Sequence, residues 1–338
     1  MKNLVSVPIR VLVTGTRGKR ALVRLLQAGV SSLGIPAWGR VTGVLPREIG
    51  PLGERVIERS GCGHVEEMRW WLRQVPSGAG AVIMENGAVS PELQGLAARW
   101  LQPGVVVWTN AWADHLESWG PGQRGAETVL LQGIPRFSKV AAGFEVARSP
   151  LVRAELEKKD CRLEFPPEAS PCHYEFGAEN LALAKLALRL LGLDAVKAGH
   201  AMESLSPDLA DFSVIRESGG VLAQAFSAND VQSAARIWGS LGWESRETVF
   251  LYNHRPDRPA RLESFMAWAK GLPWKEACLT GPFASGLFGS HSLERVHITT
   301  TGDLRRFIGD KKRVFGCGNV AGVPIRYLEE RRAGKHAA

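Results

Sequence analysis

The segment from Val11 to Arg20, V-L-V-T-G-T-R-G-K-R, has the residue types of a site that binds a nucleotide phosphate. A short apolar run leads into a loop with glycines at Gly15 and Gly18, and Lys19 closes the loop before a segment of helical character. Backbone N–H groups of such a loop point at a bound phosphate, and the N-terminus of the following helix adds positive potential. Lys19 would place a point charge beside the β- and γ-phosphates.

This loop departs from the usual phosphate-loop pattern G-x-x-x-x-G-K-[ST] at two positions. Val13 stands where the first glycine is expected, and Arg20 stands where a hydroxyl residue would ligate Mg²⁺. An ordinary turn between a strand and a helix explains the string equally well. The rest of the sequence must therefore decide between a phosphate site and a plain turn.

Polar residues also follow two later strand-like segments. Glu85 and Asn86 come directly after the apolar run 81–84, and the run 105–109 leads into Asn110 and His115. Ligands of a parallel α/β sheet collect beyond the carboxyl ends of its strands. Taken alone, each residue has a structural explanation, since a glutamate can begin a helix and a histidine can lie on the surface or in a core. Together with the loop they favour a Mg²⁺–nucleotide site, because Mg²⁺ prefers oxygen ligands and a second metal ion could accept an imidazole.

These residues must be positioned by alternating strands and helices. Near-continuous apolar strands between helical segments predict mostly parallel sheets with helices on both faces. The expected strands cover residues 9–14, 81–84, 105–109, 139–142, 221–226, 249–252, 277–280, 296–300 and 313–316, and the expected helices cover 20–32, 65–74, 91–100, 181–191, 231–241 and 260–269.

The 338 residues are enough for two domains, each with its own core. A polar segment at 206–208 ends a helical stretch, and a new series of strands opens after Gly220. We therefore expect a nucleotide-binding domain at 1–213, a second α/β domain at 214–328 and a disordered, charged tail at 329–338.

Composition limits the classes of function. The chain carries 42 basic and 34 acidic residues, a net charge of +8 that suits an anionic ligand such as a nucleotide. The basic residues are scattered along the chain, so we expect no nucleic-acid partner. Five cysteines without a C-x-x-C pair indicate a reducing compartment, and no apolar run approaches the roughly 20 residues of a membrane span. We expect a cytosolic protein.

Two further patterns have ordinary structural explanations. The string Gly316-x-Gly318-x-x-Ala321 imitates a dinucleotide-binding fingerprint, but too little chain follows it for a complete unit, which favours a structural turn. Trp70 and Trp71 are adjacent on a predicted helix and lie ~100° apart around its axis, so both cannot face the core. The exposed one could mark a protein partner.

The order and identity of these segments resemble the Mur ligase superfamily and, within it, the ligase subunit of capsule-type poly-γ-glutamate synthases. The similarity runs from about Arg10 to Tyr327. The matching strings are Gly15-Thr16-Arg17-Gly18-Lys19, Glu85 through Glu92, Asn110 through Gly120, Phe226 through Asp230, Asn253 through Arg258 and Phe315 through Val320.

The resemblance implies a central ATP-binding domain followed by a Rossmann-like domain. It implies an ATP- and Mg²⁺-dependent carboxylate–amine ligase that acts through an acyl phosphate, with γ-glutamyl polymerisation as the specific reaction. The substrates would be an acidic amino acid or peptide and an amine acceptor. A membrane-embedded partner subunit and a homo-oligomer are left open, so the protein could lie at the membrane through its partner.

The resemblance also implies roles for individual residues. Lys19 and the loop amides would hold the phosphates, and Glu85 and His115 would each bind a metal ion. The implied nucleotide contacts of the first domain are Gly15, Thr16, Arg17, Gly18, Lys19, Arg20 and Asn110. In the second domain, Asn229, Asp230, Asn253, Asp257 and Arg258 would meet the nucleotide or the incoming amine.

Arg20 keeps an alternative open. It replaces a metal-binding hydroxyl with a cation, so a catalytically silent or regulatory nucleotide-binding subunit is the second hypothesis. A phosphate-loop GTPase or kinase is disfavoured, because the segment 253–258 does not resemble the guanine-reading N-K-x-D. The second aspartate of the superfamily string D-H-L-D is Glu117 here, and residues 126–133 contain no lysine for carbamylation.

Overall fold

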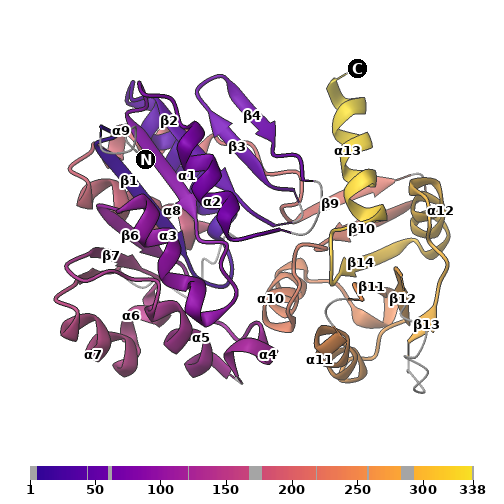
Figure 1. The fold of residues 1–338 in the computed structure, drawn as a ribbon. Coiled ribbons are helices and arrows are strands. Elements are labelled where there is room, and N and C mark those ends of the chain that lie inside the picture. The colour runs from indigo at the N-terminus through magenta and orange to yellow at the C-terminus, as the bar shows by residue number, and fades with distance from the viewer. Residues whose placement is uncertain are drawn as a thin grey trace. The chain divides into compact units, whose positions relative to one another are not determined.

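A computed structural model describes residues 6–43, 45–59, 63–120, 122–166, 177–217, 219–256, 259–282 and 293–336. The chain forms two compact units, Met1–Ser206 and Pro207–Ala338, coloured from indigo to yellow along the chain in Figure 1. The division lies shortly before the boundary expected between residues 213 and 214. Each unit is an α/β structure with a mainly parallel sheet, as the sequence predicts.

The first unit is built on a sheet whose described strands follow the order β4-β3-β2-β5-β1-β6-β7-β8. The neighbouring strands β2, β5, β1, β6, β7 and β8 pair in parallel. Strands β3 and β4 continue the sheet from β2 as an antiparallel edge. The strands are β1 (Ile9–Thr14), β2 (Ala37–Val41), β3 (Arg47–Gly50), β4 (Gly53–Val56), β5 (Ala81–Glu85), β6 (Val105–Trp108), β7 (Lys139–Ala142) and β8 (Arg162–Glu164). The helices are α1 (Lys19–Ser32), α2 (Glu66–Gln74), α3 (Gln94–Leu101), α4 (Leu116–Trp119), α5 (Gly122–Leu131), α6 (Phe144–Arg148), α7 (Pro150–Lys158), α8 (Ala178–Leu190) and α9 (Ala195–Glu203).

Helices cover both faces of this sheet because its strands are apolar on both sides. In β1, Val11 and Val13 pack into one core with α1, α8 and α9. Leu12 points to the opposite face and packs into a second core with helices that include α2, α3 and α5. The alternation of side chains along a strand thus produces two cores from one apolar run.

The second unit has a smaller sheet of described strands in the order β13-β12-β11-β14-β10-β9, parallel except for β9. Helices α10 and α11 pack on an aromatic core that includes Phe250 and Phe315, while α12 packs against β10 and β14. The elements are β9 (Ser213–Glu217), β10 (Gly220–Gln224), α10 (Val231–Leu241), β11 (Val249–Asn253), α11 (Pro259–Lys270), β12 (Glu276–Thr280), β13 (Glu294–Arg295), α12 (Thr301–Lys311), β14 (Arg313–Cys317) and α13 (Val323–His336).

Two expectations about the second unit differ from the structure. The strand expected at 296–300 is absent there, and the strand pairing ends at Arg295. Thr300 instead caps α12, since its hydroxyl accepts the Asp303 N–H at 3.1 Å and the Asp303 carboxylate accepts the Thr300 N–H at 3.0 Å. Residues 329–336, expected as a disordered tail, form the last turns of α13.

The tryptophan pair on α2 divides as the helix geometry requires. Trp71 is 4% exposed and lies in the core, whereas Trp70 is 52% exposed and stacks on His64. Among the described residues, no helix is both long and apolar enough to span a membrane.

Candidate active site

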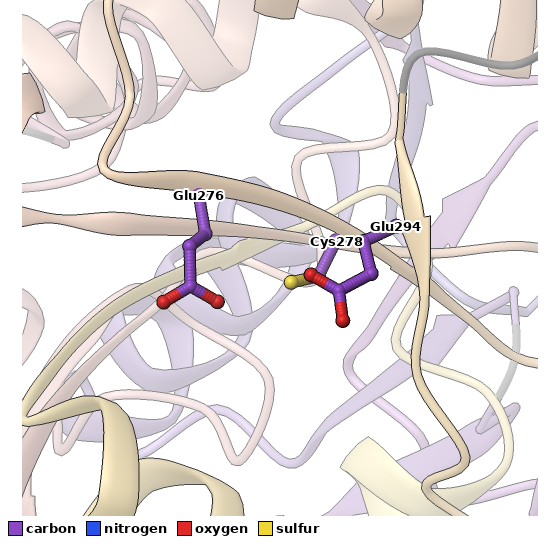
Figure 2. Close-up of side chains that lie close together, drawn as sticks. All are labelled: Glu276, Cys278 and Glu294. Carbon is purple, nitrogen blue, oxygen red and sulfur yellow. The ribbon is translucent and has the colours of Figure 1, made fainter.

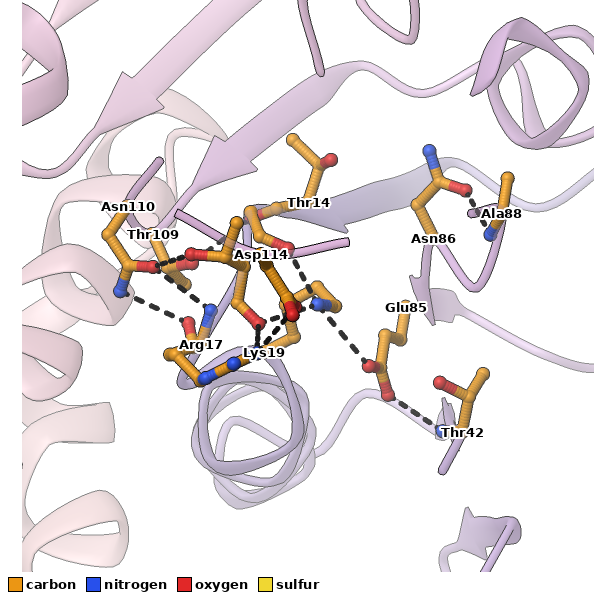
Figure 3. Close-up of polar contacts among 12 residues, drawn as sticks. Thr14, Arg17, Lys19, Thr42, Glu85, Asn86, Ala88, Thr109, Asn110 and Asp114 are labelled. Atoms are coloured by element: carbon orange, nitrogen blue, oxygen red, sulfur yellow. Dashed lines mark hydrogen bonds and ion pairs between the residues drawn. The ribbon is translucent and has the colours of Figure 1, made fainter. Parts of the chain in front are cut away.

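The tips of β1, β5 and β6 lie side by side at the carboxyl edge of the first sheet. Val13 in β1 is in register with Glu85 in β5, and Thr14 is in register with Trp108 in β6. The phosphate-loop segment, Glu85 and the segment from Asn110 therefore leave the sheet next to one another (Figure 3). This is the convergence that the sequence predicts.

The loop after β1 requires glycine at two positions. Gly15 has φ +125°, and a Cβ there would lie 2.1 Å from the Thr109 hydroxyl oxygen. Gly18 has φ +78°, and its Cβ would lie 2.9 Å from the Asn180 side chain. Helix α1 then begins at Lys19 without a side-chain cap and without an acidic residue in its first turn. Its first N–H groups thus keep the capacity to bind an anion.

Lys19 is held at the centre of this edge. Its Nζ donates to the carbonyl oxygens of Gly15 at 2.6 Å and Thr16 at 3.2 Å, and lies 3.9 Å from Glu85 Oε1 (Figure 3). Burial lowers the pKa of Lys19, and the cations of Arg17 and Arg20 add to this effect against the opposing carboxylate of Glu85. The nearby carboxylates therefore do not fully compensate the positive charge of the ammonium group, and a bound phosphate would add the missing negative charge.

Asn110 clamps the loop. Its Oδ1 accepts the Thr16 hydroxyl at 2.6 Å and the Arg17 N–H at 2.9 Å, and its Nδ2 donates to the Arg17 carbonyl at 3.3 Å. The Thr16 N–H also donates to the Asn110 carbonyl at 3.1 Å. The amide group of Asn110 is thus engaged with the loop itself, so the structure shows it as a residue that fixes the shape of the cradle.

A second link joins the loop to His115. The Arg17 guanidinium is 2.7 Å from Asp114 Oδ2, and the same oxygen is 3.5 Å from His115 Nε2. His115 has φ +47°, a left-handed conformation that starts the turn into α4, and its ring lies 4.9 Å from that of Trp119. Asp114 was not among the predicted site residues, although its place beside His115 was a signal for it.

Glu85 is 7% exposed and faces α1. Its Oε2 accepts the Thr42 N–H at 2.7 Å, which ties the tip of β5 to the end of β2. Thr42 was missed because β2 itself was not predicted. Glu85 and His115 both lie at this edge, and their roles as metal ligands stay predictions.

The predicted residues of the second unit have mostly structural contacts. The Asp230 carboxylate caps α10 by accepting the Ser233 N–H at 2.8 Å and its hydroxyl at 2.7 Å. Asn253 Nδ2 donates to the carbonyl oxygens of Asn319 at 2.7 Å and Ala321 at 3.0 Å. The buried Oδ1 of Asn229 has no hydrogen-bond partner within the described part of the chain. Asp257 and Arg258 lie outside the described residues.

A group of metal-ligating residue types lies on β12 and β13. One side-chain atom from each of Glu276, Cys278 and Glu294 falls within 4.8 Å of the others, with the thiol between the two carboxylates (Figure 2). Lys311 forms an ion pair with Glu276, and burial raises the pKa of Cys278 to about 12. The ion pair with Lys311 already accounts for one of the two carboxylates, and we assign no metal to this group.

The glycines of the fingerprint-like string are explained by packing. A Cβ on Gly316 would lie 2.4 Å from the Phe226 ring, and one on Gly318, which has φ +100°, would lie 2.5 Å from the Tyr252 ring. These positions need glycine because aromatic rings press against the backbone.

Comparisons with known proteins agree with this arrangement. Residues 210–333 match the family described as "Poly-gamma-glutamate synthase CapB C-terminal domain". The chain is 23% identical to PGA synthase CapB of Bacillus subtilis (strain 168), covering 97% of this chain and 91% of that protein. It is 27% identical to the capsule biosynthesis protein CapB of Bacillus anthracis, covering 100% of this chain and 80% of that protein. The predicted resemblance to poly-γ-glutamate synthases is confirmed.

Solved structures show the same fold over the whole chain. E. coli FolC in complex with DHPP and ADP has a TM-score of 0.68 at 17% identity, covering 99% of this chain and 92% of that one. MurF from Acinetobacter baumannii has a TM-score of 0.66 at 16% identity, covering 100% and 78%. A bifunctional folylpolyglutamate synthase/dihydrofolate synthase with Mn, AMPPNP and L-glutamate bound has a TM-score of 0.68 at 15% identity, covering 99% and 91%. The Mur-ligase-like fold is confirmed.

Proposed function

We propose that this chain, a Mur-ligase-like relative of poly-γ-glutamate synthases, joins a carboxylate to an amine at the expense of ATP. The observation that carries the proposal is the cradle at the carboxyl edge of the first sheet, where the partly buried Lys19 side chain lies between loop carbonyls and Glu85. The sequence relatives are named synthase and capsule biosynthesis protein, and the structural relatives include ligases, which supports the same class of reaction.

The loop fits the phosphates of a nucleotide. Gly15 and Gly18 have φ of +125° and +78°, and loops with such conformations can turn successive N–H groups toward an anion. The uncapped N-terminus of α1 and the ammonium group of Lys19 both favour negative charge there. The ADP and AMPPNP complexes of the structural neighbours support a nucleotide of the adenine series.

The chemistry of the donor set fits a divalent cation. Glu85 would hold one ion through its carboxylate, and His115 would hold a second through its imidazole, oriented by Asp114. Mg²⁺ is the ion we propose, and the neighbour described with Mn supports a divalent metal of this kind. When bound, the metal would neutralise charge on the phosphoryl oxygens.

The reaction then proceeds in two displacements. A carboxylate oxygen attacks the γ-phosphorus, the bond to the β-phosphate oxygen breaks, and ADP departs with the bonding electron pair. The amine nitrogen attacks the acyl carbon, the C–O bond to phosphate breaks, and phosphate leaves while the nitrogen gives up a proton. Lys19 and the loop amides hold the phosphates in line, so positioning and charge neutralisation are the main contributions of the protein.

The substrates belong to the acidic class. We propose a glutamate-type carboxylate with an amine acceptor, on the basis of the poly-γ-glutamate synthase relatives and the neighbour described with L-glutamate. A membrane-embedded partner subunit and a homo-oligomer stay predictions.

A second candidate function rests on Arg20. Arg20 occupies the place of the metal-binding hydroxyl, and its charge acts on Lys19. A regulatory subunit would bind the nucleotide at the same cradle without transferring its phosphate.

One assay separates the two functions. Purified protein with ATP and Mg²⁺ should release ADP and phosphate only when a glutamate carboxylate and an amine acceptor are both present. Thermal stabilisation by ATP and by GTP, measured in parallel, reports binding without chemistry. Stabilisation by ATP with no turnover under any substrate pair would favour the regulatory subunit, and preferential stabilisation by GTP would overturn the adenine assignment.

A further inference from the structure

A basic cleft lies at the opposite edge of the first sheet from the phosphate loop. It has a volume of about 490 Å³ and is lined by Lys139, Arg162, Glu164 and residues 189–192. Lys139 and Arg162 are the first residues of β7 and β8, which run parallel to β6 and β1. The first residues of β7 and β8, the last residue of β8 and the end of α8 form the cleft, whereas the candidate active site lies at the carboxyl ends of β1, β5 and β6.

The charges of this cleft are not balanced. Its lining has three cationic side chains and one carboxylate, and that carboxylate, Glu164, is already 2.5 Å from Arg162 Nη2. Lys139 Nζ donates to the Leu190 carbonyl at 3.0 Å. The negative end of the α8 dipole therefore offsets part of the Lys139 charge. Within the described residues, Arg189 has no ion-pair partner.

We propose that this cleft binds an acidic oligomer, through the guanidinium groups of Arg162 and Arg189. Guanidinium groups bind carboxylates in a bidentate manner, and an excess of three cations over one carboxylate in the same cleft favours an anionic ligand. The identity of the anion rests on the proposed function, because a chain of glutamates carries one carboxylate per residue and would be a substrate or product of that reaction. The cleft would hold this chain at a distance from the site of chemistry.

The test uses a fluorescein-labelled decamer of γ-linked glutamate, titrated with the full chain in the absence of nucleotide and followed by fluorescence anisotropy. The double variant Arg162→Gln/Arg189→Gln should weaken binding roughly fivefold, since each exposed charge contributes modestly. The matched control is Arg136→Gln/Lys158→Gln, which removes two charges from exposed ion pairs outside the cleft. The control should bind the decamer as the unmodified chain does.

A variant with the opposite sign makes the test sharper. Glu164→Gln removes the carboxylate that competes for Arg162, so it should tighten binding of the decamer about twofold. Thermal unfolding of each variant reports whether the fold is intact. An unchanged affinity in Arg162→Gln/Arg189→Gln, or an equal loss in the control, would overturn the proposal.

Two further outcomes are informative. One distinguishes a γ-glutamyl chain from other polyanions as the ligand, and the other distinguishes the proposed cleft from the proposed ligase function. Displacement of the decamer by polyphosphate or by single-stranded DNA at equal charge concentration would replace the acidic oligomer with a general polyanion. Binding of the decamer that depends on the cleft, in a protein that never releases ADP, would support the cleft and overturn the proposed ligase.

Discussion

The carboxyl edges of the two sheets differ in the kind of polar residue that they carry. The first sheet ends in ionisable groups, which include Lys19, Glu85 and the Arg17–Asp114 pair. Three strands of the second sheet end in buried neutral groups, Gln224, Asn253 and Thr280, all at most 4% exposed, whereas the short β13 ends in exposed Arg295. Parallel sheets therefore place polar residues at this edge in both units, and the proposed phosphate site is the edge where those residues are charged.

Hydrogen bonding separates the two edges less clearly than charge does. Asn253 donates to two backbone carbonyls, and Gln224 Nε2 donates to the Asp211 carbonyl. In the first unit, by contrast, Lys19 is desolvated without full compensation. The neutral edge is bonded only in part to its own backbone, because Gln224 Oε1 and Thr280 Oγ1 are buried without a hydrogen-bond partner among the described residues. The two edges thus differ in charge rather than in how completely their polar atoms are bonded.

The largest effect is expected from Lys19→Ala. This variant removes the cation beside the phosphates, so ATP should no longer raise the unfolding temperature, and ADP release should fall at least roughly 100-fold. Differential scanning fluorimetry and a coupled ADP assay measure the two effects. Retained stabilisation by ATP in this variant would place the nucleotide elsewhere.

The next effect, from Asn253→Ala, tests the neutral edge. The change leaves a buried carbonyl at Asn319 and a partly buried one at Ala321 with fewer donors, so the free energy of unfolding should fall by roughly 1–3 kcal/mol. Urea unfolding measures this loss. If the residue only supports the fold, the KM for ATP stays unchanged, whereas a KM raised several-fold would return Asn253 to the nucleotide contacts that the resemblance implies.

The strand tips were predictable because their strands are continuous apolar runs. Strand β2 was not, since its sequence A-W-G-R-V interrupts the apolar pattern. Gly39 lies where a Cβ would meet Val23 at 3.1 Å, and buried Arg40 is 2.9 Å from Glu67. Tertiary packing thus stabilises a strand whose sequence does not predict one. Because β2 was not predicted, the hydrogen bond from Thr42 to Glu85 was not predicted either.

A local hydrogen-bond pattern was overlooked at 296–300. The β-branched residues V-H-I-T-T favoured a strand, but Thr300 and Asp303 have the spacing of a capping box and begin α12. The place of Asp114 beside His115 was a signal in the sequence, but its ion pair with Arg17 joins residues 97 positions apart and depends on the tertiary fold. Residue types at the site were therefore predictable, whereas their mutual contacts were not.

A smaller effect concerns pH. Burial lowers the pKa of Lys19 below its ordinary value of 10.5, so between these two values the unfolded chain binds more protons than the folded one. The loss of folding stability caused by the charged Lys19 is complete below the pKa of the folded state. This loss becomes smaller as the pH rises toward 10.5. The unfolding free energy of the unmodified chain relative to Lys19→Met should therefore rise with pH in that window, as measured by urea unfolding. A flat difference would contradict the burial of a charged Lys19.

The smallest effect is expected from Arg20→Ser. Restoring a hydroxyl after the lysine should leave ATP stabilisation intact and increase Mg²⁺-dependent turnover modestly. Titration of ADP release with Mg²⁺ measures the change. Loss of turnover in this variant would give Arg20 a positive role in the reaction.

The most direct measurement is a crystal structure with AMPPNP and Mg²⁺. We predict a triphosphate against the N–H groups of residues 15–19, with Lys19 Nζ contacting it and metal ions on Glu85 and His115. Phosphates bound away from the tips of β1, β5 and β6, or Lys19 still bonded to the loop carbonyls with the nucleotide present, would contradict the central claim.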